Sequence, residues 1–281
     1  MYCLPDCDIE RFIEEDVPYG DLTTHLLAIG AMPGRIVFRS REEATLCCTE
    51  EAARVLRKSG ATVSACLPSG TLVPAGVDFL EADGPAQALH TGWKVALNLL
   101  EYASGIASCT ARIVSTVHSV NPDVAVLATR KSFPGTKKIA IKALTAGGGL
   151  PHRLGLSETV LVFKQHTAYL GGLEPFLGLL ADIRLRARET KIIVEAETHE
   201  EALLIASSSA DVVQLDKIKA TELTAAVQAI RVANPNILIS AAGGINEMNV
   251  AEFAATGIDI IVLSSIYFGK PSDIGATIIP V

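Results

Sequence analysis

Aromatic residues are scarce in this chain, and it has neither a long hydrophobic run nor an excess of positive charge. Phe, Trp and Tyr make up 5% of its 281 residues, whereas hydrophobic residues as a whole make up 49%. Aliphatic side chains must therefore fill the core, which is typical of helices packed on parallel strands. No apolar run reaches the roughly 18 residues that a membrane-spanning helix needs, so we expect no membrane partner.

The shortage of positive charge bears on partners and on location. The formal net charge is −7, which argues against general nucleic-acid binding. The sequence of residues 1–16, MYCLPDCDIERFIEED, lacks the basic start and long apolar core of a signal peptide. We therefore expect a cytoplasmic protein, whose six cysteines are free thiols in a reducing environment. Cys3 and Cys7 are spaced like metal ligands, but no second pair follows, so metal binding there is not favoured.

The first third of the chain does not alternate strands and helices regularly. Asp8 and Thr49 are expected to cap helices, and Asn121-Pro122 marks the end of a long amphipathic helix. The expected helices are 8–16, 49–59 and about 92–120, and the expected strands lie within 35–48 and over 62–66 and 77–82.

From residue 124 onward the pattern changes to repeats of a strand followed by a helix. Such repeats predict a parallel sheet with right-handed crossovers. Charged residues and glycines follow the strands, and a barrel brings its carboxyl strand ends to one mouth. We therefore favour a closed or nearly closed barrel over an open doubly wound sheet. The expected strands are 124–129, 159–163, 192–196, 211–215, 237–241 and 258–263, and the expected helices are 136–146, 173–189, 199–208, 220–232 and 246–255.

Positive charge is concentrated between Thr129 and His166, against the acidic background. This concentration predicts a pocket for a small anion. Arg130 and Lys131 follow the first barrel strand, where a guanidinium can pair with carboxylate or phosphate, although surface salt bridges are the alternative. The other cations in the cluster are Lys137, Lys138 and Lys142.

Glycines interrupt this stretch and recur later in the chain. The segment 147–149 is Gly-Gly-Gly and precedes His152-Arg153, so we interpret it as a ligand loop, although a flexible connection would look the same. Gly243 and Gly244 lie between a strand and a helix, where backbone N–H groups can bind phosphate.

Two carboxylates end successive strands of the expected barrel. Glu195 and Asp216 could hold Mg²⁺, which often takes one or two carboxylates together with phosphate oxygens. They could also stabilise a cationic centre. Pairing with Lys217 and Lys131 is the structural alternative.

Taken together, these motifs resemble the quinolinate phosphoribosyltransferases, also called carboxylating nicotinate-nucleotide pyrophosphorylases. The wording of FPGTKK, GGGLPHRLGLSET and VFKQH is most similar to the ModD branch, whose members are linked to molybdenum transport. The segments that follow family order are PYGDLTT (18–24), ALNLLEYASGIAS (96–108), TRKSFPGTKK (129–138), GGGLPHRLGLS (147–157) and QLD (214–216).

The resemblance implies an α/β fold and a reaction. An N-terminal α/β sandwich (1–105) would join an incomplete TIM-like α/β barrel (106–269), and 270–281 would return to the N-terminal domain. The protein would be a homodimer with shared sites, or a higher homo-oligomer. It would join a small heteroaromatic acid to phosphoribosyl pyrophosphate with Mg²⁺, releasing pyrophosphate and then CO₂. Carboxylates near the ribose and cations near the pyrophosphate would stabilise the charges that develop.

The resemblance also implies three groups of site residues. The side chains that would bind the acid are Arg130, His152, Arg153, Lys164 and, from the partner subunit, Lys94. The catalytic residues at the phosphoribosyl donor would be Lys131 and two carboxylates that also hold the ribose hydroxyls and Mg²⁺, Glu195 and Asp216. Gly243 and Gly244 would bind phosphate.

Three departures from the family weaken the recognition of a dicarboxylate or a phosphate. The family's strand-end lysine falls on Phe163, and Lys164 comes one residue later, on the opposite face of an extended strand. Lys94 replaces an arginine and cannot make a bidentate contact. Ala241-Ala242 replace two serines. We therefore expect the donor site to be kept and the acceptor to differ from quinolinate.

Two other functions fit the same fold, because fold alone does not decide function. The loss of a lysine and two hydroxyls favours a non-catalytic sensor or binding protein for an anion or nucleotide, linked to molybdenum uptake. A phosphate-binding lyase or isomerase would need a Schiff-base lysine, and no strand end provides an obvious one. Phosphoribosyl transfer is the favoured prediction.

Overall fold

The computed structural model describes residues 2–281, which divide into two compact units. The first contains the chain up to Ala111 together with 132–148 and 267–281, and the second contains 112–131 and 149–266. The sequence predicts 132–148 within the barrel domain. These residues instead pack in the first unit, because α5 (Lys137–Ala146) contributes Ala143 to the hydrophobic core there.

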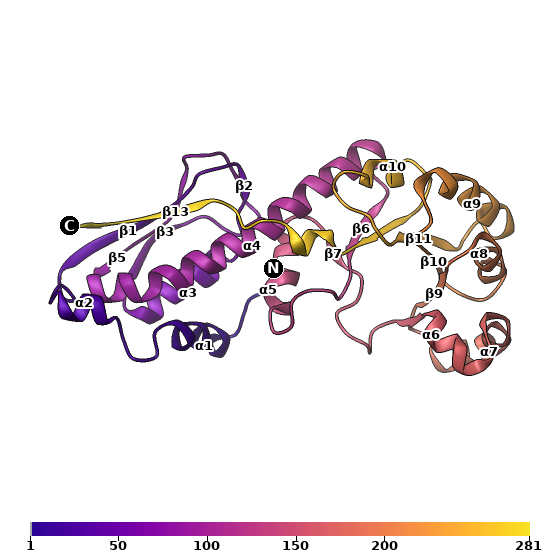
Figure 1. Cartoon of the computed structure of the whole chain (residues 1–281), viewed down its shortest axis with the longest axis horizontal. Helices are drawn as coiled ribbons and strands as arrows, with labels where there is room; N and C mark the ends of the chain where they lie inside the picture. Colours follow the sequence, from indigo (N-terminus) through magenta and orange to yellow (C-terminus); the bar gives the residue numbers. More distant parts are fainter. Residues whose placement is uncertain (1) are drawn as a thin grey trace. The chain divides into compact units, whose positions relative to one another are not determined.

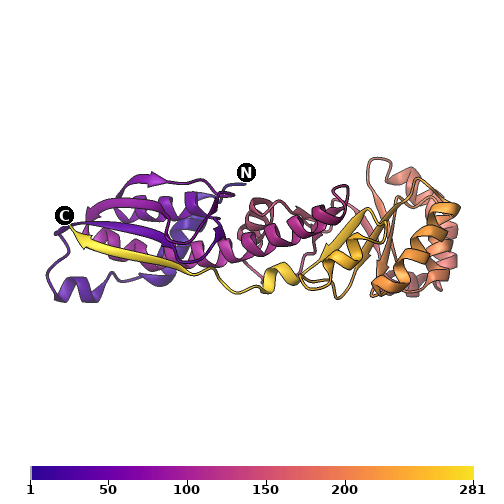
Figure 2. The same ribbon diagram turned by 90° about the horizontal axis from the view of Figure 1, so that it is seen from above.

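A four-stranded antiparallel sheet with the order β13-β1-β5-β3 forms the framework of the first unit. The chain's last strand pairs with its first, from Gly34↔Pro280 to Ser40↔Ile274, as the yellow strand shows in Figures 1 and 2. The strands are β1 (Pro33–Ser40), β3 (Thr62–Cys66), β5 (Asp78–Pro85) and β13 (Ile274–Pro280), and a separate pair is formed by β2 (Ala44–Thr45) and β4 (Leu72–Val73).

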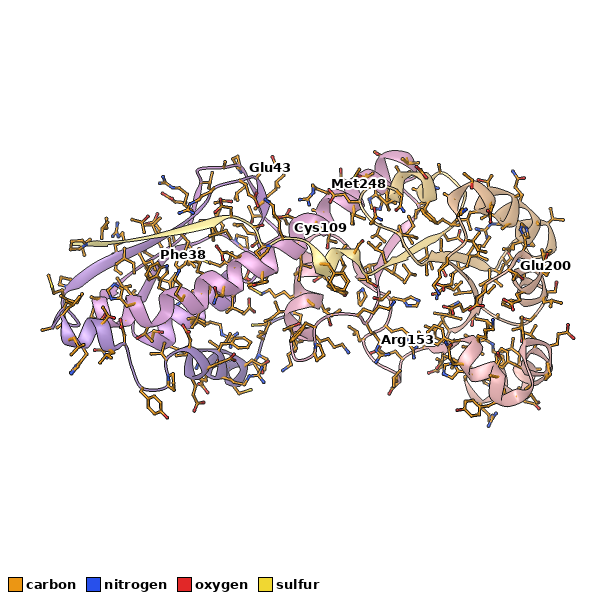
Figure 3. All side chains as sticks on the ribbon, viewed as in Figure 1. Phe38, Glu43, Cys109, Arg153, Glu200 and Met248 are labelled. Atoms are coloured by element: carbon orange, nitrogen blue, oxygen red, sulfur yellow. The ribbon has the colours of Figure 1, made fainter. Side chains whose placement is uncertain are left out.

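Alternating burial along β1 gives the sheet one apolar face. Ile36 and Phe38 are buried and the residues between them are more exposed, as expected for a strand covered on one side. Phe38, labelled in Figure 3, belongs to the same core as Leu56 and Leu100 from two helices. The helices of this unit are α1 (Asp6–Asp16), α2 (Leu22–Leu26), α3 (Thr49–Ser59), the first part of α4 (Ala86–Val120) and α5.

The helix starts differ from the expected ones. α1 begins at Asp6 after Pro5, so Asp8 is not its N-cap. The N-cap of α3 is Cys48, one residue before Thr49 and in a left-handed conformation with φ of 59°. The sequence pattern does not indicate α2, which Asp21 caps by accepting two backbone hydrogen bonds.

The second unit contains a seven-stranded parallel sheet with the order β7-β6-β12-β11-β10-β9-β8. β7 and β8 are its two edges, so the barrel is incomplete and the predicted α/β fold class is confirmed. Six strands coincide with the predicted runs. β7 is missed because two residues carry no periodic signal. The strands are β6 (Ala125–Ala128), β7 (Leu150–Pro151), β8 (Val160–Val162), β9 (Ile192–Ala196), β10 (Val212–Asp216), β11 (Leu238–Ala242) and β12 (Ile260–Leu263).

The two faces of this sheet differ in character. Ile192, Val194 and Ala196 are buried on one face of β9, whereas Glu195 lies on the other face and is half-buried. α8 packs on β9 and β10, and Figure 1 shows α8 and α9 beside these strands. The helices are α6 (Lys164–Thr167), α7 (Leu173–Arg186), α8 (His199–Ala206), α9 (Ala220–Ala233) and α10 (Val250–Ala254).

Two negative findings concern residues 2–281. None of the helices in that range combines the length and apolar character needed to cross a bilayer. No group of three or more His, Cys, Asp or Glu side chains there could hold a metal ion, and the six cysteines are thiols rather than disulfides.

Candidate functional site

Most of the predicted site residues follow the carboxyl ends of parallel strands in the second unit. Since the strands are parallel, these ends share one edge of the sheet. From the end of β6 round to the end of β11, they are Arg130 and Lys131, His152 and Arg153, Lys164, Glu195, Asp216, and Gly243 and Gly244.

The acidic side of this edge is organised by a buried glutamine. Gln214 is 4% exposed, pairs in register with Glu195, and donates from Nε2 to Glu195 Oε2 over 3.1 Å. Its Oε1 atom is buried without a hydrogen-bond partner. Burial, reinforced by the negative charge of Asp216, raises the pKa of Glu195 above its usual value. The pair of carboxylates therefore carries negative charge that nothing fully compensates.

One cation partly balances this group. Lys217 Nζ lies 3.0 Å from Asp216 Oδ2, which bears out the structural alternative for Asp216 alone. The Lys217 side chain is 78% exposed, so this pair is weak. Glu195 makes no ion pair within residues 2–281.

The residues present fit a magnesium ion. Mg²⁺ is held by one or two carboxylates and keeps waters or phosphate oxygens for its other positions, so a larger protein cage is not needed. The raised pKa of Glu195 and the partnerless Oε1 of Gln214 both indicate a place where positive charge would be favourable.

Gly243 is required by close backbone packing next to Asp216. Its φ is +91°, and a Cβ there would lie 2.8 Å from Lys217 N and 2.9 Å from Asp216 Oδ1. Gly244 has φ of +73° with open space around it. Consecutive glycines in this conformation expose backbone N–H groups, which is compatible with the predicted phosphate contact.

The basic side of the edge begins with Arg130 and Lys131. Both side chains are exposed, and no carboxylate of residues 2–281 forms an ion pair with either. The surface salt bridges considered as their alternative are therefore not formed. Free cations at a strand end are suited to an anionic ligand.

His152 and Arg153 follow β7. Burial, with the nearby charge of Arg153, lowers the pKa of His152 to about 4, so the imidazole is neutral at neutral pH. Arg153, labelled in Figure 3, is 8% exposed and donates from Nη2 to the carbonyls of Thr159 (3.0 Å) and Leu156 (3.5 Å). Its Nε is buried without a partner. Arg153 thus holds its own loop and keeps one donor unused.

Lys164 differs from the other predicted substrate-binding residues because its charge is matched. Its Nζ lies 2.8 Å from Glu197 Oε2, and this contact raises its pKa. Lys164 lines a cleft of about 260 Å³ together with Glu195, Glu197 and Glu201. Three carboxylates face one paired cation there, so the cleft is acidic overall.

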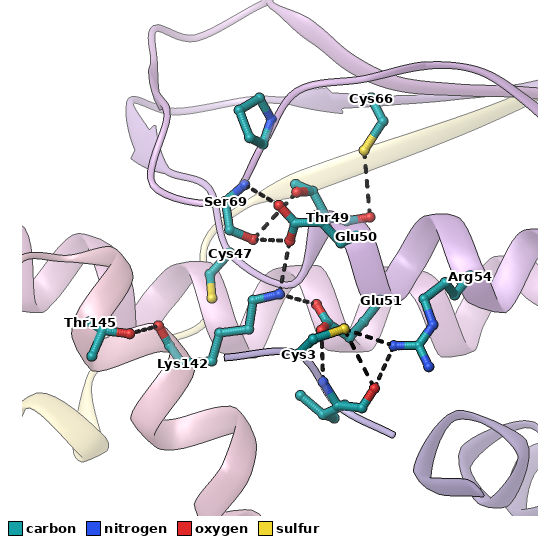
Figure 4. Close-up of polar contacts among 12 residues, drawn as sticks. Cys3, Cys47, Thr49, Glu50, Glu51, Arg54, Cys66, Ser69, Lys142 and Thr145 are labelled. Carbon is teal, nitrogen blue, oxygen red and sulfur yellow. Dashed lines mark hydrogen bonds and ion pairs between the residues drawn. The ribbon is translucent and has the colours of Figure 1, made fainter. Parts of the chain in front are cut away.

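Three of the five cations predicted to form an anion pocket belong to the first unit, and two of them, Lys138 and Lys142, pair with carboxylates there. Lys138 pairs with Asp8 over 2.7 Å. Lys142 is 2% exposed and pairs with Glu51 (2.5 Å) and Glu50 (2.9 Å), as Figure 4 shows. The ligand role expected for this part of the cluster is wrong for Lys142, because its ammonium is buried and two carboxylates already match its charge.

The glycines at 147–149 also have a structural reason. A Cβ on Gly147 would lie 2.4 Å from Ala107 O and 2.6 Å from Thr110 Cβ, so only glycine lets α5 end against α4. Gly148 has φ of +86°, as residues that end helices often do. Gly147 and Gly148 therefore have structural reasons that need no ligand.

Lys94 lies in the first unit, with its Nζ 4.6 Å from the centroid of the Trp93 ring. Its role in a partner's site stays a prediction. Sequence reasoning missed Gln214, although its place two residues before Asp216 in the same strand puts both on one face. That alternation was the available signal.

The comparisons with known proteins cover both parts of the chain. The family models of quinolinate phosphoribosyl transferase match residues 21–104 for the N-terminal domain and 106–275 for the C-terminal domain. The ModD protein of Pasteurella multocida is 37% identical over 98% of this chain and 97% of its own length. The carboxylating nicotinate-nucleotide pyrophosphorylase of Rattus norvegicus is 31% identical over 92% of this chain and 86% of its own.

Solved structures share the fold at lower identity. The crystal structure of NadC from Streptococcus pyogenes matches with a TM-score of 0.89 and 24% identity over 100% of both chains. The family that the motifs predicted is confirmed: this chain belongs to the quinolinate phosphoribosyl transferase family.

Proposed function

We propose that the protein transfers the phosphoribosyl group of phosphoribosyl pyrophosphate to the ring nitrogen of a quinolinate-type acid, meaning a flat nitrogen heterocycle that carries carboxylate. Family membership makes it a phosphoribosyltransferase. The single observation that carries the proposal is the separation of charge at one sheet edge. Carboxylates that one exposed cation balances only in part lie at the ends of β9 and β10, and the cations that follow β6 form no ion pair within residues 2–281.

The acidic side suits the ribose. Breaking the bond between C1′ and pyrophosphate builds positive charge on the sugar, and preorganised negative charge stabilises that state. Glu195 and Asp216 supply this charge, and Gln214 holds the Glu195 carboxylate in place. The same carboxylates accept hydrogen bonds from ribose hydroxyls. Mg²⁺, when bound by them, would neutralise the pyrophosphate oxygens.

The cationic side suits the leaving group and the acid. Lys131 and the backbone N–H groups of Gly243 and Gly244 would bind phosphate oxygens as negative charge develops on them. Arg130 and the unused Nε of Arg153 would bind carboxylate. The neutral imidazole of His152 can donate one hydrogen bond there without adding charge.

Assembly and location belong to the same proposal. We propose a homodimer in which Lys94 acts at the partner's site, because no carboxylate of residues 2–281 pairs with Lys94 and its ammonium is held only over a Trp93 ring. The cytoplasm is the proposed compartment.

Pyrophosphate release tests the proposal. The purified protein is supplied with phosphoribosyl pyrophosphate, Mg²⁺ and a panel of pyridine and other heteroaromatic acids, and released pyrophosphate is measured. We expect release with at least one acid, and none when Mg²⁺ is removed by chelation. An Asp216→Asn variant serves as the inactive control.

A binding protein on the same fold is the second candidate, because Lys164 is paired and Ala241-Ala242 offer no hydroxyl donors. It predicts tight binding of phosphoribosyl pyrophosphate in calorimetry with no release of pyrophosphate for any acid. That result would replace the transferase proposal.

A further inference from the structure

Phe163 places an aromatic ring on the site face of the sheet, at the carboxyl end of β8. Its φ of −106° and ψ of 165° continue the extended strand by one residue, so its side chain shares a face with Leu161. Leu161 pairs in register with Ile193, and Ile193 shares its face with Glu195. The half-buried Phe163 ring is therefore level with Glu195 across the strand pair.

A second ring extends this surface. The His166 ring stacks on Phe163 with centroids 5.6 Å apart and planes inclined by 17°. His166 Nδ1 accepts the backbone N–H of Phe163 over 3.0 Å. Nδ1 is thus occupied as an acceptor, which leaves Nε2 as the donor of an exposed ring. Together the two side chains form a flat aromatic wall with one hydrogen-bond donor.

Charge at the carboxyl edge of the sheet is divided between the end that holds β7 and β6 and the end that holds β9 and β8. The cations that would bind the carboxylate of an acid are Arg130, which follows β6, and Arg153, which follows β7. Burial is the main cause of the lowered pKa of Arg153, and the nearby charge of Arg130 lowers it further. At the end of the sheet that holds β8 and β9, Lys164 forms an ion pair with Glu197. Glu195 and Glu201 add further negative charge there. A carboxylate facing that side would meet the aromatic ring of Phe163 and like charges.

We propose that Phe163 and His166 are specificity-determining residues and that the acceptor is a flat heteroaromatic acid with a single carboxylate. Its ring packs on the Phe163 face, and its carboxylate faces Arg130 and Arg153. This inference rests on the proposed function. The ring nitrogen's lone pair forms the bond to C1′, the C1′–oxygen bond breaks with its electrons leaving on pyrophosphate, and the product is a ring cation. No proton and no CO₂ leave the acceptor.

The test compares one acid with its homologue carrying a second carboxylate. Pyridine-3-carboxylate and pyridine-2,3-dicarboxylate are supplied with phosphoribosyl pyrophosphate and Mg²⁺, and pyrophosphate and CO₂ are both measured. We expect the wild type to prefer the monoacid and to release pyrophosphate without CO₂. Phe163→Lys is expected to shift the ratio of kcat/KM toward the diacid by about 10- to 100-fold, as a hydrogen bond to a charged group does.

Two further variants keep this test interpretable. Phe163→Leu removes only the ring and should raise KM for the monoacid by about 3- to 10-fold, the usual range for an aromatic pair. Tyr169→Leu, at a ring 93% exposed in the same connection, should change neither acid. The inference is overturned if both Phe163 variants keep the wild-type preference for the monoacid. It is also overturned if the wild type releases pyrophosphate faster with the diacid. Neither result contradicts the transferase function.

Failure of the proposed function can be distinguished from failure of this inference. If no acid gives pyrophosphate, calorimetric binding of the monoacid decides. Binding that Phe163→Leu weakens and Tyr169→Leu does not supports the wall without the transferase. Binding equal in all three proteins, or none, overturns the inference.

Discussion

Two clusters of charge in this molecule differ in balance. In the Lys142 cluster, which consists of Lys142, Glu50, Glu51 and Ser69, one buried cation lies between two carboxylates (Figure 4). In the Glu195 cluster, which consists of Glu195, Gln214, Asp216 and Lys217, the one exposed cation pairs with Asp216 only, and an amide oxygen has no partner.

Their pKa shifts run in opposite directions for this reason. Burial would raise the pKa of Glu50, but hydrogen bonds from Ser69 and Lys142 outweigh it and lower the pKa to about 2. Burial and Asp216 raise the pKa of Glu195 without such compensation. A buried cluster whose charges balance stabilises the fold as long as none of its partners is removed. A cluster with excess negative charge favours a cationic ligand. Breaking each should therefore have a different consequence.

The largest expected effect is the loss of stability in Lys142→Met. The change leaves Glu51, which is 0% exposed, without its counter-charge. We expect the free energy of unfolding to fall by about 3–5 kcal/mol, measured by urea denaturation. Lys137→Met, at an exposed position of the same helix, should stay within about 0.5 kcal/mol of the wild type. Equal stability of the two variants would contradict the structural role.

Glu195→Gln should lower activity without lowering stability, the reverse of Lys142→Met. Removing a carboxylate that repels Asp216 should not lower the free energy of unfolding. The loss of charge at the ribose should lower kcat/KM by about 10²–10³-fold, the usual range for one preorganised electrostatic group. Glu222→Gln, at an exposed position of α9, is the control for both measurements. Unchanged turnover in Glu195→Gln would show that the Glu195 cluster is not catalytic.

Gly243→Ala and Gly244→Ala separate close packing from backbone strain. Both residues have positive φ, which costs about 1–2 kcal/mol for an alanine. Only at residue 243 would the Cβ also meet Asp216 and the Lys217 backbone. Thermal unfolding should therefore show a larger loss for Gly243→Ala, together with a raised KM for phosphoribosyl pyrophosphate. A larger effect at residue 244 would mean that the Asp216 contact does not matter.

At neutral pH the smallest expected effect is that of His152, because its contribution changes only as the pH falls. Its pKa is about 4 in the folded protein against an ordinary value of 6.5. The unfolded chain therefore binds a proton more readily, and stability is lost as the pH falls from about 6.5 to 4. His152→Gln should flatten this decline in urea denaturation series. NMR should show no titration of His152 above pH 5.5, and a midpoint above 6 would rule out the buried neutral ring.

Sequence reasoning succeeded where one physical signal dominates. The parallel strands are buried aliphatic runs, so six were predicted nearly to the residue, and the strand ends of Arg130, Glu195 and Asp216 followed from them. It failed where neighbours in sequence separate in space. Lys142 belongs to a cation cluster in the sequence but to a buried ion cluster in the fold. Partners such as Glu51, which lies on another helix, have no local signature.

The Glu195 cluster was predictable only in part for a related reason. A carboxylate after a strand is visible in the sequence, but the unused Oε1 of Gln214 depends on which atoms surround it. The pairing of Lys164 with Glu197 likewise joins two strand ends and could not be anticipated. Residue types at strand ends were therefore predictable, and their charge balance was not.

The pairing of β13 with β1 sets an order of events during synthesis. β1 emerges from the ribosome early, but its neighbour β13 is made after every strand of the parallel sheet. Until then one edge of β1 is unpaired, and exposed strand edges attract other chains. The first sheet therefore stays unfinished until the parallel sheet has been synthesised, and β1 keeps one unpaired edge until then.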